Sequence, residues 1–443
     1  MTRHPSEHQP TSRACGNHPN PLTEERGLTA DRTASTEGAT EEESGRHVHR
    51  DIVLRIGNRR LTRGGTLAVV TDREAIEELS GLFLFLADND FPEYSPIYER
   101  LARSIAADRD LLEFIEVSAH PNARRGRVPV LFFASTHDRV LADPDSEIAA
   151  IYRGESDADP MPPFLALLDR ERSAVVTNMR TRSVQTNEVG RSAALAPGLG
   201  AVEHADRDIA IVELGPSAGL NLFVDRWHID YLRDGRPVGS VGPAGSPVQL
   251  HCDLRGPLDP PPFTLGPIAR RTGVDPAPID ATDPDQARWL QACIWPGVAE
   301  RRERLAAALS VAAADPPLLV QGDAVTDLAP LVDSIDPRQI PVVVSTWALA
   351  YISSEGRESI FADLDAIGST RDLAIVTLEE PRFTPWIAAP DDVATRCHET
   401  GEGTPTVLGL RQWIGGACTS TLLSLCHPHV RWMRWLDGGS NDG

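Results

Sequence analysis

The feature that most constrains the fold is an alternation of short apolar runs with helical segments, which begins near residue 209. Residues 284–314 form one helical segment, with Trp289, Ile294 and Leu305 on its apolar side. This alternation predicts a doubly wound α/β fold, in which helices cover both faces of a largely parallel sheet. The predicted strands are residues 209–214, 318–321, 341–345 and 373–378.

Two further segments are expected to extend this sheet. Residues 406–413 and 419–425 lie close together in the sequence and predict an antiparallel hairpin at the sheet edge. The Gly- and Pro-rich segment 228–266 is interpreted as an insertion. Within it, Val248–Cys252 alternates between apolar and polar residues, which predicts a β-hairpin.

The chain before the sheet has a different character. Residues 1–60 are rich in Ser, Thr, Glu, Gly and Pro and lack apolar periodicity, which predicts a disordered tail. Thr71–Glu74 matches a helix capping box, and apolar residues follow it at spacings of three and four. We therefore expect a helical domain over residues 65–200, which caps the mouth of an active site in a second domain over residues 201–437.

Charge and composition exclude several classes of protein. The formal net charge of -21 disfavours a nucleic-acid partner, because an acidic surface repels phosphate backbones. All 43 basic residues are arginine, so the lysine needed by Walker A loops, protein kinases and pyridoxal enzymes is missing. The chain has no apolar run of about 18 residues and no signal peptide, which predicts a cytoplasmic protein without a membrane partner. Its six cysteines form no C-x-x-C pair and are interpreted as reduced thiols.

A glycine-rich loop follows the first predicted strand, in the sequence IAIVELGPSAGLNL. Its centre fits the G-x-S-x-G pattern that presents a nucleophilic Ser217 in hydrolases, with Asp323 or Glu379 as the acid and His427 as the base. However, Pro216 restricts the strained turn that such a serine requires. The predicted helices upstream also do not supply the earlier strands of a hydrolase.

The same loop also suits a nucleotide-like cofactor, because an acidic residue precedes glycines between a strand and a helix. A nicotinamide dehydrogenase is disfavoured, since Ser217 and Leu220 occupy the second and third glycine positions of G-x-G-x-x-G. Asn221 follows the loop and is either turned into the cofactor site or a helix-face amide.

The stretch Glu213–Gly219 resembles the first motif of class I S-adenosylmethionine-dependent methyltransferases, E/D-x-G-x-G-x-G. The resemblance implies a Rossmann-like sheet and S-adenosylmethionine as cofactor. It also implies that Glu213 accepts hydrogen bonds from the methionine end, while Gly215 and Gly219 let the backbone approach the cofactor closely. Ser217 replaces the middle glycine of the motif and would line the same cofactor.

The residues Gly273–Pro276 resemble the next element of that family, in which an acid at the end of a strand holds the ribose hydroxyls. This implies a ribose-binding role for Asp275. The spacing from the glycine loop is long because of the insertion, so Asp230 and Asp253 within the insertion compete for the role.

Two later stretches resemble the family in the same order. LLVQGDA is similar to the segment that meets the adenine, which implies roles for Asp323 and Ala324. VVVSTWALAYI is similar to the fourth-strand segment beneath the reaction centre, which places Trp347 among the substrate-binding candidates.

A second resemblance covers most of the ordered chain. It is carried by the segments QTNEVGRSAAL (185–195), ELGPSAGLNL (213–222), SPVQLHCDLRG (246–256), IDATDPDQARWLQACIWP (279–296) and HPHVRWMRWL (427–436). Together they resemble an uncharacterised bacterial family, domain-of-unknown-function family 2332, which is common in high-GC actinobacteria. The resemblance implies a shared architecture and no particular substrate.

Polar residues upstream of the loop are candidates for substrate binding. Asn187, Glu188 and Arg191 lie on a predicted helix, where Gln185, Glu188 and Arg191 stand three apart and share a face. This face either closes over the cofactor and grips an anionic substrate, or is an ion-paired surface between domains. Trp295 is either a wall of the pocket or a core residue at a helix break.

Two residues are candidates for a general base. The ordinary pKa of His427 is near 6.5, and Glu379 follows a predicted strand whose carboxyl end faces the crevice. His427 and His429 would point to opposite faces of a strand, so we expect no metal site there. Arg301, in the segment RRERL, is interpreted as part of a solvated helix face.

These observations predict an S-adenosylmethionine-binding protein, and specifically a methyltransferase that acts on a small molecule. Two alternatives remain. One is a non-catalytic ligand-binding or regulatory protein on the same fold, and the other is a serine hydrolase that uses Ser217.

Overall fold

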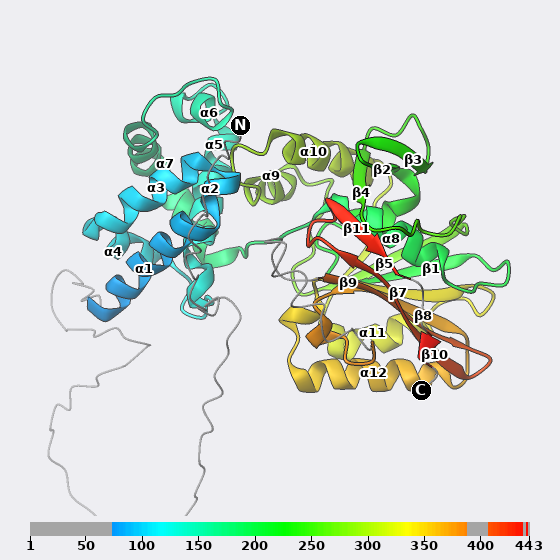
Figure 1. The fold of residues 1–443 in the computed structure, drawn as a ribbon. Helices are drawn as coiled ribbons and strands as arrows, with labels where there is room; N and C mark the ends of the chain where they lie inside the picture. The colour runs from blue at the N-terminus through cyan, green and yellow to red at the C-terminus, as the bar shows by residue number, and fades with distance from the viewer. Residues whose placement is uncertain (1–72, 388–405, 437–439, 442–443) are drawn as a thin grey trace, which may run out of the picture.

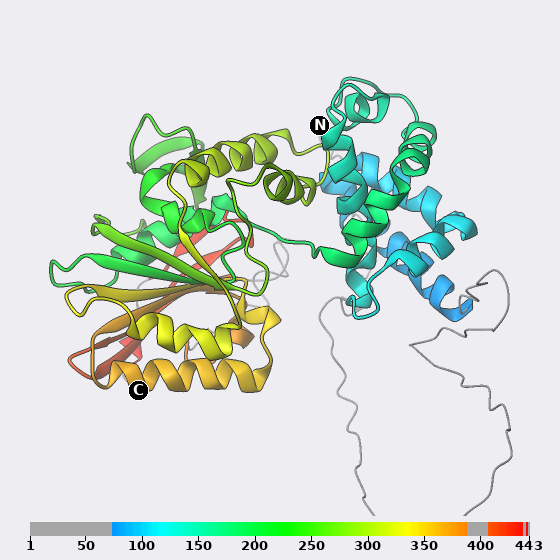
Figure 2. The same ribbon diagram turned by 180° about the vertical axis from the view of Figure 1, so that it is seen from behind.

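The computed structural model describes residues 73–387, 406–436 and 440–441 of the chain. A group of helices stands beside a twelve-stranded sheet, and the chain crosses between them through the extended residues 182–188 (Figures 1 and 2). The predicted tail and the first two residues of the predicted capping box, Thr71 and Asp72, lie outside the described residues.

The N-terminal helices share one core. Phe83, Phe133 and Tyr98 pack within it, and the rings of Tyr98 and Phe133 are stacked 4.2 Å apart. Ser95 and Asp108 cap two of the helices, because their side chains accept hydrogen bonds from the first-turn amides. The helices are α1 (Arg73–Asn89), α2 (Phe91–Tyr94), α3 (Pro96–Ala107), α4 (Arg109–Ser118), η1 (Arg125–Arg127), α5 (Val128–Ala142), α6 (Glu147–Tyr152) and α7 (Met161–Thr181).

The remaining chain builds the sheet, whose strand order is β3-β2-β4-β11-β10-β9-β8-β7-β1-β5-β6, with β12 paired to β10. Strands β6, β5, β1, β7 and β8 are mutually parallel. The four predicted strands are β1, β6, β7 and β8, so the prediction of a mixed α/β sheet is confirmed. The strands are β1 (Ile209–Leu214), β2 (His228–Arg233), β3 (Arg236–Val241), β4 (Gln249–Leu254), β5 (Ile268–Asp275), β6 (Leu318–Gln321), β7 (Ile340–Thr346), β8 (Leu373–Glu379), β9 (Thr406–Ile414), β10 (Ala417–Cys426), β11 (Trp432–Trp435) and β12 (Ser440–Asn441).

The predicted hairpin near the C-terminal end is present, but its predicted position at the sheet edge is wrong. Strands β9 and β10 are antiparallel, and the sheet continues beyond them through β11, β4, β2 and β3. The continuation depends on the pairing of Trp432 in β11 with Asp253 in β4. The insertion therefore extends the sheet: its hairpin is formed by β2 and β3, and the alternating segment is β4, which runs parallel to β2.

Helices cover both faces of the sheet (Figures 1 and 2). On β1, Ile209 and Ile211 contact one core, and Ala210 and Val212 contact the other. This double burial explains why the strand is a continuous apolar run. The first core includes η2 (Val189–Arg191), α8 (Ser192–Gly200), η3 (Leu220–Arg226), α9 (Pro284–Ala292) and α10 (Ala299–Ala314), and the second includes α11 (Ala324–Asp333), η4 (Leu349–Tyr351), α12 (Ser354–Gly368) and η5 (Pro381–Phe383).

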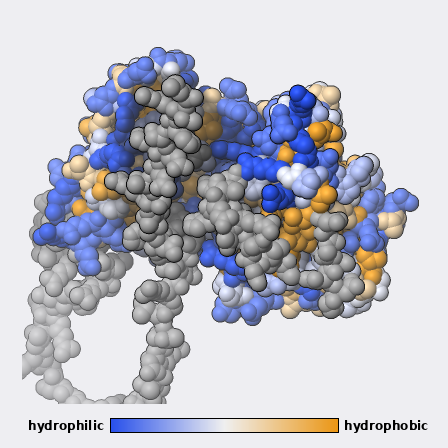
Figure 3. All heavy atoms as spheres, viewed as in Figure 1, coloured by the Kyte–Doolittle hydropathy of each residue, from blue (hydrophilic) through white to orange (hydrophobic). Residues whose placement is uncertain are grey.

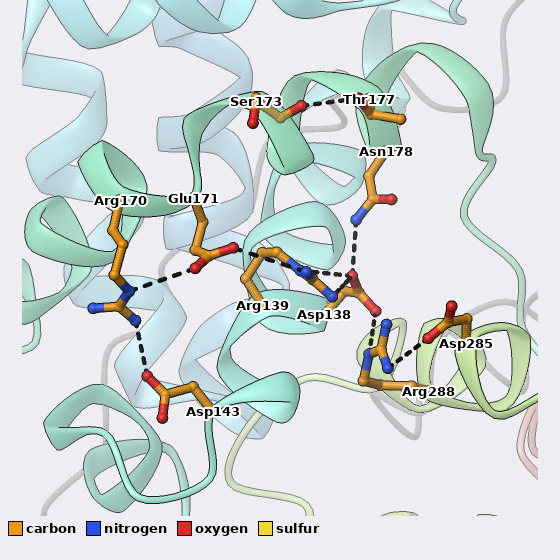
Figure 4. Close-up of polar contacts among 10 residues, drawn as sticks. All are labelled: Asp138, Arg139, Asp143, Arg170, Glu171, Ser173, Thr177, Asn178, Asp285 and Arg288. Carbon is orange, nitrogen blue, oxygen red and sulfur yellow. Dashed lines mark hydrogen bonds and ion pairs between the residues drawn. The ribbon is translucent and has the colours of Figure 1, made fainter.

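The predicted helix 284–314 consists of two helices, because the chain breaks at residues 293–298 between α9 and α10. Helix α9 joins the helical part to the sheet part through a buried ion pair (Figure 4). Asp138 of α5, whose side chain is 4% exposed, accepts hydrogen bonds from Arg288 of α9 and Asn178 of α7, each at 2.9 Å.

The surface is mixed in character. In the view of Figure 1, the helical part is largely hydrophilic, and hydrophobic residues gather over the strands of the sheet (Figure 3). Among the described residues, no helix combines the length and the apolar character needed to cross a membrane.

Candidate functional site

The carboxyl ends of β1 and β7 lie side by side, at the position where doubly wound sheets have their ligand crevice. The two strands are neighbours. Among the parallel strands β1, β5, β6, β7 and β8, taken in chain order, the strand after β1 lies on one side of this pair and the strand after β7 lies on the other, although β2, β3 and β4 come between β1 and β5 in the sequence. In parallel sheets, ligands bind where the connections diverge in this way. The loops after the two strands approach closely, since a Cβ added at Gly215 would lie 3.2 Å from the Cβ of Ala348.

Glu213 is the second-last residue of β1, next to this position, and is 1% exposed. Burial raises the pKa of its carboxyl to about 8, against the lowering effects of Asn221 and Arg191. One carboxyl oxygen, Oε1, accepts a hydrogen bond from Asn221 Nδ2 at 3.3 Å. The other oxygen, Oε2, has no partner among the described residues. A buried carboxyl with an unused oxygen is costly and suits a cationic or hydrogen-donating ligand.

The glycine loop after β1 is strongly curved. Gly215, Ser217 and Gly219 have φ angles of 60°, 54° and 70°, in the left-handed region. For Ser217 this conformation is strained, and such strain occurs preferentially at functional sites. The Ser217 amide donates to Asp275 Oδ2 at 2.9 Å, and its hydroxyl donates to Gln185. The hydroxyl therefore bonds to an amide side chain and not to a histidine.

The acids predicted to hold the ribose and the adenine lie at the ends of β5 and β6, at the same edge of the sheet as Glu213. Asp275 is the last residue of β5, and Asp323 follows β6. Asp275 is buried and accepts from the amides of Ser217 and Ala277, so it anchors the loop. Asp323 is exposed and caps α11 by accepting from Val325 N at 2.9 Å. Ala324 is the first residue of that helix.

The competing acids of the insertion lie elsewhere in the sheet. Asp230 is on β2 and Asp253 is on β4, and β11, β10, β9, β8 and β7 stand between β4 and β1. Asp230 instead contacts His228 of its own strand, at 3.2 Å.

The predicted helix over residues 185–191 is wrong. Residues 182–188 are extended and only Val189–Arg191 forms a short 3-10 turn, so Gln185, Glu188 and Arg191 do not share a face. The reason is that this segment makes tertiary hydrogen bonds to the glycine loop. Gln185 accepts from the Ser217 hydroxyl, and Asn187 Nδ2 donates to the carbonyl of Pro216.

Arg191 turns towards the crevice, where it is 7% exposed. Its guanidinium donates to the carbonyl oxygen of Thr346, at the end of β7, at 3.0 Å, and to that of Pro428 at 3.4 Å. Burial lowers the pKa of Arg191, and Glu188 and Glu379 act in the opposite direction. Arg191 thus links the ends of β7 and β10.

Glu188 turns the other way, towards α10. Its side chain is 2% exposed and contacts Arg301 at 2.7 Å and Arg304 at 3.3 Å. Burial by itself raises the pKa of Glu188, but Arg301, His429 and Arg304 outweigh this effect and lower the pKa to about 2. The interpretation of Arg301 as part of a solvated helix face is therefore wrong, since Arg301 and Arg304 neutralise a buried carboxylate.

Glu379 ends β8 and is fully buried. Its Oε1 accepts from Ser345 Oγ at 2.7 Å and from the amides of Ala348 and Leu349 at 2.9 and 3.1 Å. Burial raises its pKa to about 7 despite these hydrogen bonds. Glu379 therefore holds the loop that follows β7. In this loop Trp347 has a φ of 60°, and its buried Nε1 has no partner among the described residues.

His427 follows β10 at the same edge of the sheet. Its Nδ1 accepts a hydrogen bond from the amide of His429 at 3.0 Å. In a neutral ring with this bond, the proton is on Nε2. The Nδ1 of His427, which would have to accept a proton, is thus already engaged in a hydrogen bond. This geometry does not favour His427 as a general base.

Trp295 lies in the break between α9 and α10, where its ring meets Phe91 edge-to-face at 4.9 Å. It lines a cavity of about 170 Å³ against His137 and Tyr152. No residue of the glycine loop lines this cavity. Trp295 is therefore a packing residue beside a cavity that is separate from the crevice.

Comparison with known proteins identifies the family of the chain. A family model described as "Uncharacterized protein conserved in bacteria (DUF2332)" matches residues 81–435, which include most of the described helices and the sheet. A search of curated proteins gave no match. The chain therefore belongs to this uncharacterised bacterial family.

Proposed function

We propose that this protein binds S-adenosylmethionine in the crevice between β1 and β7 and transfers its methyl group to a small molecule. The observation that carries the proposal is Glu213, a buried carboxyl near the end of β1, one oxygen of which has no partner among the described residues. A ligand with an ammonium group would supply the hydrogen bonds and the positive charge that this oxygen lacks.

The strand order supports a Rossmann-like, methyltransferase-like sheet. When β1, β5, β6, β7 and β8 are counted from one to five along the chain, they stand in the order 3-2-1-4-5. The classic doubly wound nucleotide-binding sheet has the same order over these strands. In that arrangement the ligand lies over the first loop, which here contains Gly215 and Ser217.

The neighbouring residues fit the rest of such a cofactor. Asp275 accepts two amide hydrogen bonds, whereas a carboxylate offers about four acceptor positions, so capacity remains for ribose hydroxyls. Asp323 is exposed at the adjoining strand end, on the side expected for the adenine. Trp347 Nε1 offers a hydrogen-bond donor on the other side of the crevice.

When bound, S-adenosylmethionine supplies a methyl group on a positively charged sulfur. The chain's own contribution is positioning, which can account for a large part of the rate in such a transfer. Arg191 and Glu379 fix the loop after β7 from two sides, through Thr346 on one and through Ala348 and Leu349 on the other.

A non-catalytic binding protein is the second candidate. It is favoured by the fact that both predicted bases are engaged in structural hydrogen bonds, His427 with the His429 amide and Glu379 with the loop after β7. An assay for labelled methyl transfer to a bacterial metabolite extract separates the two candidates, provided that the cofactor binds.

Isothermal titration with S-adenosylmethionine and S-adenosylhomocysteine tests the proposal. Gly215→Arg should abolish binding, because the new side chain starts 3.2 Å from Ala348 at a φ of 60° and fills the crevice. Gly245→Arg is the matched control, since no atom lies within 4 Å of a Cβ at this exposed position. Absence of heat with the wild-type protein, or equal loss in both variants, would refute the proposal.

A further inference from the structure

A cavity of about 310 Å³ lies apart from the glycine loop, where the helical part meets the sheet part. Its wall is formed by Tyr94 of α2, Leu250 of β4, the first turns of α10, the linker residue Glu188 and the turn after β10. Figure 1 shows α10 crossing near β4 and β11. The volume is at the lower end of the range for small-molecule sites.

The buried charges of this cavity do not balance. Arg301 and Arg304, with side chains 26% and 19% exposed, flank the single buried carboxylate of Glu188. The other acids of the wall face water: the side chain of Glu300 is 82% exposed, and Asp253 is exposed on β4. Water screens the exposed charges of Glu300 and Asp253 far more than the less exposed charges inside the cavity. The interior of the cavity therefore carries an excess of positive charge.

One of these arginines, Arg304, has an unused donor among the described residues. A guanidinium has five N–H groups, and the Nε of Arg301 lies 2.7 Å from Glu188 Oε2. Arg304 uses both terminal nitrogens on Glu300 and Glu188, whereas its buried Nε has no partner among the described residues. Two arginines in the wall of one cavity, one of them with an unpartnered N–H group, match the oxygens of a carboxylate or a phosphate.

The turn after β10 adds an independent observation. Val430 N bonds to the His427 carbonyl at 2.8 Å and closes a turn that places His429 and Val430 in the cavity wall. Val430 has a φ of 52°, which is a genuine outlier for a β-branched residue. Backbone strain of this kind is concentrated at ligand sites and persists only where the surroundings enforce it.

We infer that this cavity binds a small organic oxyanion, a carboxylate or a phosphate ester, whose oxygens are held by Arg301 and Arg304. The apolar body of the ligand lies against Leu250 and Tyr94. This inference does not depend on methyl transfer.

Ligand-observed NMR titrations with benzoate, phenyl phosphate and benzamide test the inference. Benzamide is the neutral isostere of benzoate, so the comparison on the wild-type protein needs no variant. We expect saturable binding of at least one anion and none of benzamide. Arg301→Gln should weaken anion binding on the order of tenfold or more, the loss for a charge-assisted hydrogen-bond pair. Arg302→Gln is the matched control, since Arg302 is on the same helix but lines the other cavity.

Three outcomes would overturn the inference: no binding of either anion, equal binding of benzamide, or equal loss in the Arg301 and Arg302 variants. Preference between benzoate and phenyl phosphate assigns the head group as carboxylate or phosphate. Repeating the titration with Gly215→Arg keeps the two hypotheses separate. If S-adenosylmethionine fails to bind while benzoate binds, the proposed function is refuted and the oxyanion site stands.

Discussion

Replacing Glu213 by glutamine should make the protein more stable at alkaline pH. The carboxyl pKa is raised from 4.5 to about 8 by burial, so the folded protein keeps a proton that the unfolded chain has lost above pH 5. Unfolded chains therefore bind fewer protons in this window, and the free energy of unfolding falls as the pH rises from about 4.5 to 8. Glutamine has nearly the same shape as the protonated carboxyl and does not titrate.

The size of the effect follows from the shift. Each pH unit is worth 1.36 kcal/mol, so between pH 5.5 and pH 8 the wild-type protein should lose about 3 kcal/mol relative to Glu213→Gln. Urea denaturation followed by tryptophan fluorescence at both pH values measures this difference. Glu379 titrates in both proteins and cancels in the comparison. A stability difference between the two proteins that does not change with pH would show that the Glu213 pKa is ordinary and would refute the reasoning.

Two further predictions concern the helical junction and the loop serine. Asp138→Asn should destabilise the protein by about 3 kcal/mol, because it removes the buried carboxylate that pairs with Arg288 and Arg139 and leaves Arg288 only the exposed Asp285. Asp336→Asn, which removes an exposed ion pair, should cause no measurable change in the same denaturation assay. A fluorophosphonate probe should leave Ser217 unlabelled, because its hydroxyl donates to Gln185 and no base activates it; stoichiometric labelling that disappears in Ser217→Ala would revive the serine hydrolase.

The strands could be predicted because their signal is local. Residues 209–214 and 373–378 are buried on both faces, and an unbroken apolar run follows directly from that environment. The glycine loop could be located for a similar reason, since the left-handed angles at Gly215 and Gly219 favour glycine. The position of β9 and β10 within the sheet could not be predicted in this way, because it depends on the pairing of β11 with β4, which are distant in the sequence.

The candidate site was only partly predictable, because some of its residues are placed by local strand patterns and others by contacts with distant segments. Glu213 and Asp275 lie at the carboxyl ends of their strands, and such ends meet at one edge of a parallel sheet. The conformation of Asn187 is set by its bond to Pro216, which overrides local helix preference. The segment around Arg301 looks like a solvent-exposed helix face, because its own sequence carries no sign of the contact with Glu188. That buried partner comes from a distant part of the chain.

The most direct test of the account is a calorimetric titration of the wild-type protein with S-adenosylmethionine at pH 7, in two buffers of different ionisation enthalpy. Glu213, with a pKa of about 8, is mostly protonated at this pH before the ligand binds. An ammonium group beside the unpartnered oxygen would favour the ionised form of the Glu213 carboxyl. Binding to the wild-type protein should therefore release about one proton per ligand, and binding to Glu213→Gln should release none. Binding with no proton release, or no binding at all, would contradict the assignment of Glu213 as the anchor of the cofactor.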